Sequence, residues 1–333
     1  MRAASLESPR SAGDTPLTIT SQPDPIPAAG ELLLKVSACA VCRTDLQICE
    51  GDLKARLLPI IPGHQAIGIV EELGEGVEDW QVGEHAGVAW LADACGNCSR
   101  CNSGNENLCE TSQFTGWDRD GGFAEFMTVR ADFAHSLPST LDPIETAPLL
   151  CGGIIGYRAL RLSGISHGGR LGLYGFGSSA RLTLQIATYW GCEVFVATRS
   201  KRDQQHALSL GATWAGGTDD LPPVALDAAI TFAPAGEVVV AALKAVDRGG
   251  TVAINAIHLD RIPEFSYEHL WWERTIRSVA NFTRQDSKEF LALATKIPIR
   301  AETEVYNLDA ANQILTDLAE GRTVGTAVIK MSQ

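Results

Sequence analysis

The chain has 333 residues, which is more than one hydrophobic core usually holds, so two domains are expected. Hydrophobic residues make up 45% of the sequence and charged residues 20%, a balance typical of a globular protein and unlike that of a disordered chain. The formal net charge is −13, and Lys and Arg form no dense cluster that could match a phosphate backbone. We therefore expect no nucleic-acid partner.

Two further features of the sequence indicate where the protein works. No apolar run approaches the length needed to span a bilayer, and the N-terminus MRAASLESPR lacks the apolar core of a secretion signal. The nine cysteines are odd in number and several lie at metal-ligand spacing, which favours reduced thiols over disulfides. These observations predict a cytoplasmic protein with no membrane partner.

The first part of the chain alternates short β-like runs with turns that contain Gly and Pro. This alternation predicts an antiparallel or barrel-like β domain. The clearest predicted strands are Glu31–Val36, Ile67–Leu73, Glu84–Leu91 and Phe123–Val129.

From about Gly153 the pattern changes to strands separated by segments of helix length, which is typical of βαβ units with a parallel sheet. The predicted strands are Leu171–Tyr174, Glu193–Thr198, Thr213–Ala215, Ala228–Phe232, Thr251–Ala256 and Arg277–Ala280. The predicted helices are Ser179–Trp190, Lys201–Leu210 and Glu237–Val246.

The tail of the chain contains a predicted helix at Leu308–Glu320 and a final strand at Ala327–Met331. We expect it to return to the first domain. The predicted organisation is thus a β-rich domain at residues 1–152, completed by residues 297–333, and a parallel-sheet domain at residues 153–296.

Four cysteines are concentrated in the loop CGNCSRCNSGNENLC, with the spacing C-x2-C-x2-C-x7-C. They are Cys95, Cys98, Cys101 and Cys109. Four thiolates can close a tetrahedral shell around Zn²⁺ and leave no position for a substrate, so we predict a structural zinc site. An iron–sulfur cluster also takes four thiolates, but its fourth cysteine usually follows after three residues or lies far away. Four free surface thiols would be chemically costly.

A catalytic zinc needs about three protein ligands and one open position, and its ligands can come from distant segments of the chain. The candidates here are Cys42, His64 and Cys151. Each has another interpretation when taken alone, because a buried cysteine often packs as a small hydrophobic residue and a histidine is often structural.

Short motifs around these candidates occur in a fixed order: CRTD at residues 42–45, PGHQ at 62–65, the four-cysteine loop, and LCGG at 150–153. They resemble successive motifs of the zinc-dependent alcohol dehydrogenases of the medium-chain dehydrogenase/reductase family, over nearly the whole chain. The resemblance implies an α/β protein with a GroES-like, β-rich catalytic domain and a Rossmann domain with a doubly wound parallel sheet.

The resemblance also assigns roles to individual residues. It implies that Cys42, His64 and Cys151 bind the catalytic zinc. It further implies that Asp45 is a carboxylate that orients the histidine ligand, and that Thr44 touches the zinc-bound alcohol and passes its proton outward.

Two positions depart from the common pattern of the family. Gln65 stands where a glutamate near the metal is usual, and Gln47 stands where many members have a histidine that ends the proton relay. An amide cannot take up a proton at neutral pH, so the relay would have to end in water or elsewhere.

The sequence GFGSSA at residues 175–180 follows a predicted strand and opens a predicted helix. It matches G-x-G-x-x-G/A in the context that dinucleotide binding requires, with Gly175, Gly177 and Ala180 at the three marked positions. Glycines allow the tight turn, and the helix N-terminus provides amide donors for a pyrophosphate. The resemblance implies that Arg43 also approaches this pyrophosphate. A simple turn is the alternative.

No acidic residue stands at the end of the second strand of this predicted domain, where a carboxylate would bind the ribose 2′-hydroxyl of NAD. The sequence there continues with Arg199, Ser200 and Lys201, which could hold a 2′-phosphate. This favours NADP, with NAD as the alternative if these charges only form a solvated helix start.

The predicted reaction is hydride transfer between a primary alcohol or aldehyde and NAD(P), with zinc as the Lewis acid. Trp90 resembles the aromatic residue that narrows the substrate pocket in microbial alcohol dehydrogenases acting on small primary alcohols. Trp117 is a second candidate pocket wall, and packing in the β domain is the alternative for both.

Other enzymes and other classes of protein remain alternatives. A polyol or cinnamyl-type alcohol dehydrogenase would share the fold, and a catalytically idle nucleotide-binding sensor would share the fold and the structural zinc. The resemblance implies a homodimer or homotetramer, and Trp271 and Trp272 are large apolar residues for an interface or a core. We expect the other thiols, Cys39, Cys49 and Cys192, to bind no metal.

Overall fold

The computed structural model describes residues 1–259 and 261–331, and these residues form two compact units. The first unit contains Met1–Cys151, Thr283–Lys288 and Ala301–Gln333. The second contains Gly152–Phe282 and Glu289–Arg300. The short segment at 283–288 thus groups with the first unit, and the domain limits expected from the sequence stay a prediction.

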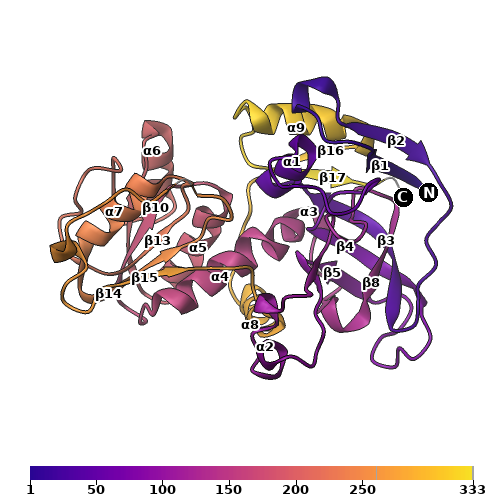
Figure 1. The fold of residues 1–333 in the computed structure, drawn as a ribbon, viewed down its shortest axis with the longest axis horizontal. Helices are drawn as coiled ribbons and strands as arrows, with labels where there is room; N and C mark the ends of the chain where they lie inside the picture. The colour runs from indigo at the N-terminus through magenta and orange to yellow at the C-terminus, as the bar shows by residue number, and fades with distance from the viewer. Residues whose placement is uncertain (260, 332–333) are drawn as a thin grey trace. The chain divides into compact units, whose positions relative to one another are not determined.

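The first unit is built on a seven-stranded sheet in which β3 is the shared strand (Figure 1). The first half of β3 pairs with β8 and its second half with β17, while β4 pairs along its other edge. All pairs are antiparallel except that of β16 with β17, as the alternating pattern of the sequence predicts. The strands are β3 (Glu31–Ala40), β4 (Ala66–Leu73), β5 (His85–Val88), β8 (Phe126–Arg130), β9 (His135–Leu137), β16 (Thr303–Tyr306) and β17 (Thr326–Lys330).

Short elements complete this unit. The paired strands are β1 (Arg2–Leu6) with β2 (Leu17–Ser21), and β6 (Leu91–Asp93) with β7 (Gln113–Phe114). The helices are α1 (Arg43–Glu50), α2 (Ser99–Asn102), α3 (Pro143–Thr146) and α9 (Ala311–Ala319). The 3-10 turns are η1 (Ala12–Asp14), η2 (Glu106–Leu108), η3 (Ala131–Phe133), η4 (Ala147–Leu150) and η6 (Leu308–Ala310).

The predicted strand Glu84–Leu91 is wrong as a single element, because β5 ends at Val88 and β6 begins at Leu91. The carbonyl groups of Ala89 and Trp90 instead accept hydrogen bonds from Thr115, at 2.8 Å from its Oγ1 and 2.9 Å from its N. This cross-connection turns the chain away from the sheet, which a one-dimensional hydrophobic pattern does not reveal.

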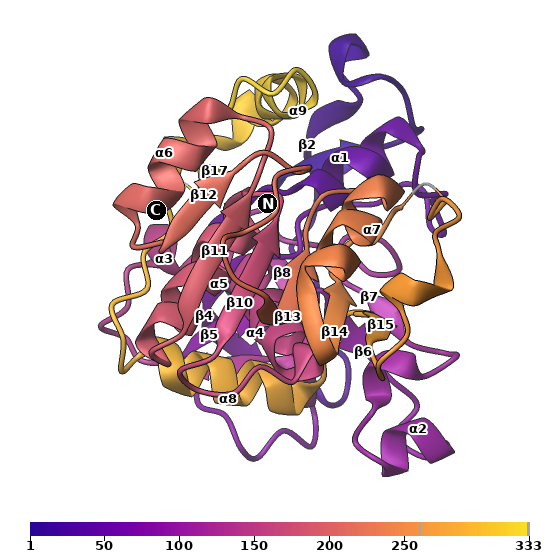
Figure 2. The ribbon, with the colours of Figure 1, turned by 90° about the vertical axis from the view of Figure 1, so that its left-hand side faces the viewer.

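The second unit contains a six-stranded, fully parallel sheet with the order β12-β11-β10-β13-β14-β15, visible in Figure 2. This order reverses between β10 and β13, which is the arrangement of a doubly wound Rossmann sheet. The strands are β10 (Arg170–Tyr174), β11 (Glu193–Ala197), β12 (Trp214–Gly216), β13 (Leu226–Thr231), β14 (Val246–Ile254) and β15 (Thr275–Ser278). All six predicted strands are confirmed, within a few residues at their ends.

The helices of this unit cover both faces of the parallel sheet. Because βαβ crossovers are right-handed, reversal of the strand order places α5 and α7 on opposite faces. The helix α7 packs on β13 and β14 over a buried cluster that includes Val239, Leu243 and Val252. The helices are α4 (Gly152–Ser163), α5 (Ser178–Tyr189), α6 (Lys201–Ser209) and α7 (Gly236–Ala245), with the turn η5 (Tyr267–His269). The helix α8 (Arg284–Ala294) is divided between the two units, since its first residues group with the first unit and the rest with the second.

The helix α4 does not follow from the sequence pattern, because its segment begins with glycines that disfavour a helix. The glycines allow α4 to lie close to α5. A Cβ added at Gly156 would lie 2.3 Å from Thr183 Oγ1. Close packing between two helices therefore overrides the local preference.

Within the described ranges, no helix is both long and apolar enough to cross a membrane.

His135 makes the stability of the first unit depend on pH. Its Nε2 is buried and has no hydrogen-bond partner among the described residues, and burial lowers the pKa of His135 to about 4. The unfolded chain binds the proton from about pH 6.5 downward. Acid should therefore cost stability between about pH 6.5 and pH 4, since the unfolded state binds more protons in that window.

We expect His135→Phe to show a smaller decrease in melting temperature than the wild type when the pH falls from about 7 to 4. Other groups also respond to acid, so the difference between the two proteins is the relevant quantity. His85→Phe, on the neighbouring strand β5, is the control. Equal pH dependence in the wild type and His135→Phe would contradict the prediction.

Candidate metal centres and active site

The structure brings Cys42, His64 and Cys151 together, although they are separated by up to about a third of the chain. Their ligand atoms all lie within 4.8 Å of one another, and Cys42 Sγ is 3.4 Å from His64 Nε2. Cys42 precedes α1, His64 precedes β4, and Cys151 follows η4. All three belong to the first unit.

Cys42 is held by the start of α1, where it is the N-cap residue. Its Sγ accepts a hydrogen bond from Thr44 N at 3.3 Å, and its own backbone N donates to Asp45 Oδ2 at 2.9 Å. This reciprocal arrangement is a capping box in which a thiolate replaces the usual hydroxyl. The local sequence CRTD therefore both starts the helix and positions one thiolate.

The other oxygen of Asp45 orients His64. Asp45 Oδ1 lies 2.9 Å from His64 Nδ1 and also accepts from Gly63 N at 3.2 Å. A carboxylate can only accept, so Nδ1 carries a ring hydrogen, and Nε2, which faces Cys42, is the nitrogen that would bind a metal. Both Asp45 and His64 are almost completely buried, at 0% and 1% exposure.

The turn that carries His64 depends on close backbone contacts. Gly63 has a φ of +99°, and a Cβ there would lie 2.5 Å from the Phe123 ring. The amides of residues 121–123 donate to the carbonyl groups of Ile61, Gly63 and Pro62 at 2.7, 2.7 and 3.0 Å. Only glycine meets both demands at position 63, so the PGHQ motif is required by packing as well as by chemistry.

Without a cation, two thiolates side by side in this buried site would repel each other. The hydrogen bond from Cys151 and the charge of His64 lower the pKa of Cys42 well below its usual value, against the effect of burial. The same hydrogen bond and burial raise the pKa of Cys151 well above its usual value. A divalent cation would relieve this conflict, because both sulfurs could then be thiolates. For tetrahedral zinc, an S···N separation of about 3.6 Å is expected, and the observed 3.4 Å fits.

Three residues that the sequence placed near this site make hydrogen bonds within the first unit. Arg43 donates from Nη1 to Leu318 O at 3.2 Å, within the first unit. Gln65 is buried and its Nε2 donates to Ala40 O at 3.4 Å, so this amide supports β3. Gln47 lies on α1 and is half-buried, and its backbone carbonyl accepts a hydrogen bond from Leu53 N at 3.0 Å.

The four-cysteine loop also forms a cluster, in which the four sulfurs lie within 4.8 Å of one another. The Sγ of Cys101 is 3.5 Å from that of Cys98 and 3.9 Å from that of Cys95. Two zinc-bound thiolates at tetrahedral angles should lie about 3.8 Å apart, whereas disulfide sulfurs lie about 2 Å apart. The four thiols are reduced, and their spacing fits a zinc ion.

The thiols of this cluster differ in acidity. A hydrogen bond from Thr111 lowers the pKa of Cys109 to about 6, and a backbone amide from Asn97 lowers that of Cys95. Burial and the neighbouring Cys98 raise the pKa of Cys101 to about 12. As in the first cluster, the thiols compete for charge without a cation, and this favours a metal site over four inert side chains.

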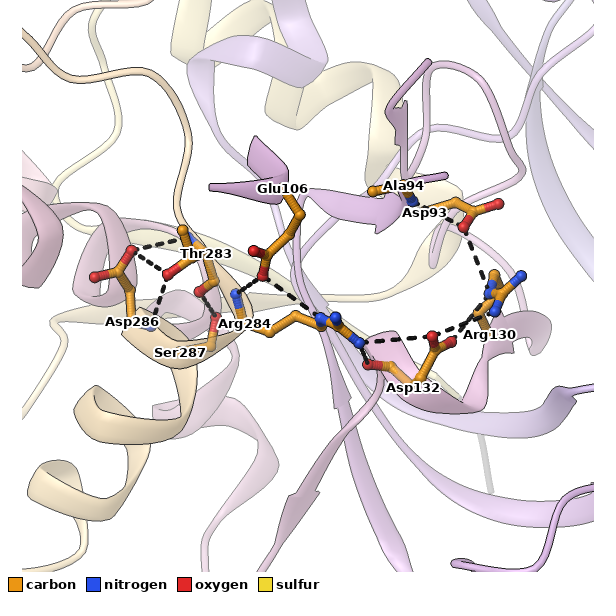
Figure 3. Close-up of polar contacts among 9 residues, drawn as sticks. All are labelled: Asp93, Ala94, Glu106, Arg130, Asp132, Thr283, Arg284, Asp286 and Ser287. Atoms are coloured by element: carbon orange, nitrogen blue, oxygen red, sulfur yellow. Dashed lines mark hydrogen bonds and ion pairs between the residues drawn. The ribbon is translucent and has the colours of Figure 1, made fainter. Parts of the chain in front are cut away.

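A carboxylate inside the four-cysteine loop ties it to α8 (Figure 3). Glu106 is buried and accepts from Arg284 N at 2.7 Å and from Arg284 Nε at 3.5 Å. Arg284 also pairs with Asp132, which is paired with Arg130. Sequence reasoning missed these residues, because the two ends of the Glu106–Arg284 contact are 178 positions apart.

Both predicted pocket tryptophans lie in an aromatic stack that begins at His64. The ring of Trp90 meets the His64 ring edge-on at 5.0 Å. Trp90 in turn stacks on Phe114 at 5.1 Å and on Trp117 at 5.8 Å. Phe114 was not among the residues predicted from the sequence, although it lies three residues before Trp117 in the segment FTGW.

In the second unit, the predicted cofactor loop has the geometry of a strand–turn–helix. Gly175 follows β10 with a φ of +89°, and a Cβ there would lie 2.9 Å from Ala233 N. Gly177 caps α5, and a Cβ there would have no atom within 4 Å, so its surroundings are open. Ala180 is buried in the first turn of α5. The amides at the start of α5 can bind an anion.

The residues after β11 have distinct positions. Arg199 is exposed, and Ser200 is the N-cap of α6, where its Oγ accepts from Asp203 N at 3.2 Å. Lys201 donates to Gln204 Oε1 at 3.1 Å. Of the three predicted phosphate ligands, the structure leaves Arg199 the most open to a ligand.

The comparisons with known proteins identify the family. Residues 28–139 match the family described as the alcohol dehydrogenase GroES-like domain. The chain is 50% identical over 311 residues to a Mycobacterium tuberculosis protein named "Probable alcohol dehydrogenase AdhA", covering 92% of this chain and 90% of that protein. The chain belongs to the zinc-dependent alcohol dehydrogenases of the medium-chain dehydrogenase/reductase family. The family and fold class expected from the sequence are confirmed.

Solved structures of alcohol dehydrogenases share this architecture. A cinnamyl alcohol dehydrogenase from Sorghum bicolor is 25% identical, with a TM-score of 0.89 over 98% of this dehydrogenase and 97% of that chain. A cobalt- and zinc-bound alcohol dehydrogenase from Pyrobaculum aerophilum is also 25% identical, with a TM-score of 0.88 over 99% of each chain.

Three further cysteines and the tryptophans at 271 and 272 belong to neither thiol cluster. Cys39, Cys49 and Cys192 are buried, free thiols, and within the described ranges they join neither metal-competent group. Trp271 and Trp272 are about half exposed, with ring centroids 5.8 Å apart. They therefore do not lie in the core of the second unit.

Asp45 should be required for stability even without metal. Asp45→Ala leaves Cys42 N, Gly63 N and His64 Nδ1 without their acceptor in a buried place, which should cost about 3 kcal/mol. We expect urea unfolding in the presence of a chelator to show this loss. Asp52→Ala, at an exposed position, is the control. Equal stability of Asp45→Ala and the control would contradict the role of Asp45.

Proposed function

We propose that this protein is a zinc-dependent alcohol dehydrogenase or aldehyde reductase that transfers a hydride between a primary alcohol or aldehyde and NADP(H). One observation carries the proposal: Cys42, His64 and Cys151 converge, and Asp45 orients the His64 ring so that Nε2 faces Cys42. Three ligands that leave one position open are the set expected for a catalytic zinc rather than a structural one.

The two clusters divide into one catalytic and one structural zinc site. The cluster of Cys95, Cys98, Cys101 and Cys109 provides four thiols, which would saturate a zinc ion and leave no place for a substrate. When bound at the three-ligand site, zinc supplies a Lewis acid for the substrate oxygen, and the nicotinamide cofactor supplies or accepts the hydride.

The residues of the chain supply orientation and proton transfer. Asp45 fixes the ring of His64, so the imidazole need not reorient during turnover. Thr44 lies two residues after Cys42 and donates its backbone N–H to that sulfur. Its hydroxyl therefore starts from the same helical turn as the ligand, and we assign it the first step of proton transfer. Gln47 cannot end this relay as a histidine would, so the proton would leave through water or another group.

The cofactor is assigned to the loop of Gly175, Gly177 and Ala180 at the switch point of the parallel sheet. The amides at the start of α5 would hold the pyrophosphate, and Arg43 is assigned to the same group by family resemblance. Arg199 and Ser200 would hold a 2′-phosphate, which supports NADP over NAD.

The aromatic stack favours small or planar substrates. Trp90 and Trp117 would bound the space around the reacting carbon, since Trp90 contacts the ring of the metal ligand His64. The likeness to a cinnamyl alcohol dehydrogenase makes aromatic aldehydes the second candidate substrate class. We assign the assembly as a homodimer or homotetramer, with the exposed Trp271 and Trp272 as candidate interface residues.

Metal analysis tests the two zinc sites together with the activity. We expect about two zinc equivalents in the wild type and about one in Cys151→Ser, with reduction of benzaldehyde by NADPH lowered more than about 1,000-fold. Cys109→Ser should lose the other equivalent and mainly lower the melting temperature. Cys192→Ser is the matched control, a buried free thiol outside both clusters. Two equivalents in Cys151→Ser would contradict the assignment.

Arg199→Glu tests the cofactor preference. The change places a carboxylate where we expect the 2′-phosphate, so KM for NADPH should rise about tenfold or more while KM for NADH changes about twofold at most. Steady-state kinetics with both cofactors give the comparison. Arg202→Glu, also exposed on α6, controls for the change in local charge. An equal rise for both cofactors would contradict a 2′-phosphate contact.

A further inference from the structure

Arg56 covers the outer end of the aromatic stack. Its guanidinium carbon lies 3.7 Å from the centroid of the Trp117 ring and 5.7 Å from that of Phe114. Its Nη1 donates to both carboxylate oxygens of Asp118, at 3.3 and 3.2 Å. The side chain of Arg56 is 47% exposed, so it sits where the stack meets solvent.

The Trp117 ring is held at more than one point. Its Nε1 donates to Lys54 O at 2.9 Å, two residues before Arg56. Asp118 is fixed in turn, because its Oδ2 accepts from Phe114 N at 2.9 Å. The segment 54–56 therefore contacts the indole ring at its Nε1–H, through Lys54 O, and at its face, through Arg56. Asp118 holds the guanidinium of Arg56 in place.

A continuous series of ring contacts leads from Arg56 to the metal ligand. Arg56 contacts Trp117, Trp117 stacks on Trp90, and Trp90 contacts His64. Protein side chains at such contacts have little room to yield, because interiors are close-packed. A Trp117 ring that could move would therefore let the Trp90 ring move as well, beside the proposed position of the reacting carbon.

We infer that Arg56 is a specificity-determining positioning residue: it clamps Trp117 so that the aromatic wall beside His64 rejects a second substituent on the reacting carbon. The substrate class is then aldehydes and primary alcohols, including flat aromatic ones, and ketones are poorer substrates. This inference rests on the proposed function, since the wall matters only if a substrate binds beside His64.

The expected effect follows from the size of the interaction. A guanidinium stacked on an indole contributes enough to change a binding ratio about fivefold, and one methyl group in a tight site changes specificity about tenfold or more. Benzaldehyde and acetophenone differ by one methyl group on the reacting carbon. The ratio of their kcat/KM values therefore measures how firmly Trp90 and Trp117 are held beside His64.

A double-mutant cycle with Arg56→Ala, Trp117→Ala and the double variant tests the inference in the zinc-loaded protein. We expect Arg56→Ala to lower the benzaldehyde-to-acetophenone ratio about fivefold, mainly through KM. In the Trp117→Ala background the same change should have no further effect, because the ring that Arg56 holds is absent. Arg10→Ala, an exposed arginine whose guanidinium donates to Ser8, should leave the ratio unchanged.

Near-UV circular dichroism of the same variants gives a readout independent of turnover. Stacking of Trp90 on Trp117, with an interplanar angle of 18°, should give a coupled aromatic signal that Arg56→Ala weakens and Trp117→Ala removes. A wild-type ratio in Arg56→Ala, or a full Arg56 effect in the Trp117→Ala background, would overturn the inference and leave the proposed function intact. Absence of wild-type turnover with every aldehyde would instead refute both.

Discussion

The buried carboxylate of Asp45 is the interaction on which the candidate active site depends. It caps α1 through Cys42 N, accepts from Gly63 N in the next motif, and fixes the tautomer of His64. One side chain thus satisfies three donors that would otherwise be buried without a partner. These hydrogen bonds hold the CRTD and PGHQ motifs in a fixed position relative to each other. Cys151 then needs only to approach from η4 to complete the group.

The two thiol clusters are built by different physical means. In the four-cysteine loop the ligands are close in sequence, and backbone amides of the loop itself donate to the sulfurs of Cys95 and Cys98. The three-ligand group is assembled by the sheet and the glycine-dependent turn at Gly63. The first arrangement can form locally around a metal, whereas the second requires the first unit to be folded.

How far the site could be predicted depends on how local its signals are. All seven candidate thiol and imidazole ligands could be named from the sequence, the four-cysteine loop by its spacing and Cys42, His64 and Cys151 by the family resemblance. Elements were less predictable where a tertiary contact opposes local preference, as at the glycine-rich start of α4 or at the break after Val88. Glu106 and Arg56 were missed, because a lone charged residue in a loop carries no signal until its partner is known.

Residue types and their spacing were enough to predict the family, the order of the motifs, the parallel sheet of the second unit and the identity of the candidate ligands. These features depend on residue type and on short-range periodicity, which one dimension preserves. The three-dimensional fold was needed to show that Asp45 binds groups of two motifs, that Trp90 contacts His64, and that Arg56 covers Trp117. Those relations join residues far apart in the chain, and they arise only when burial brings the segments together.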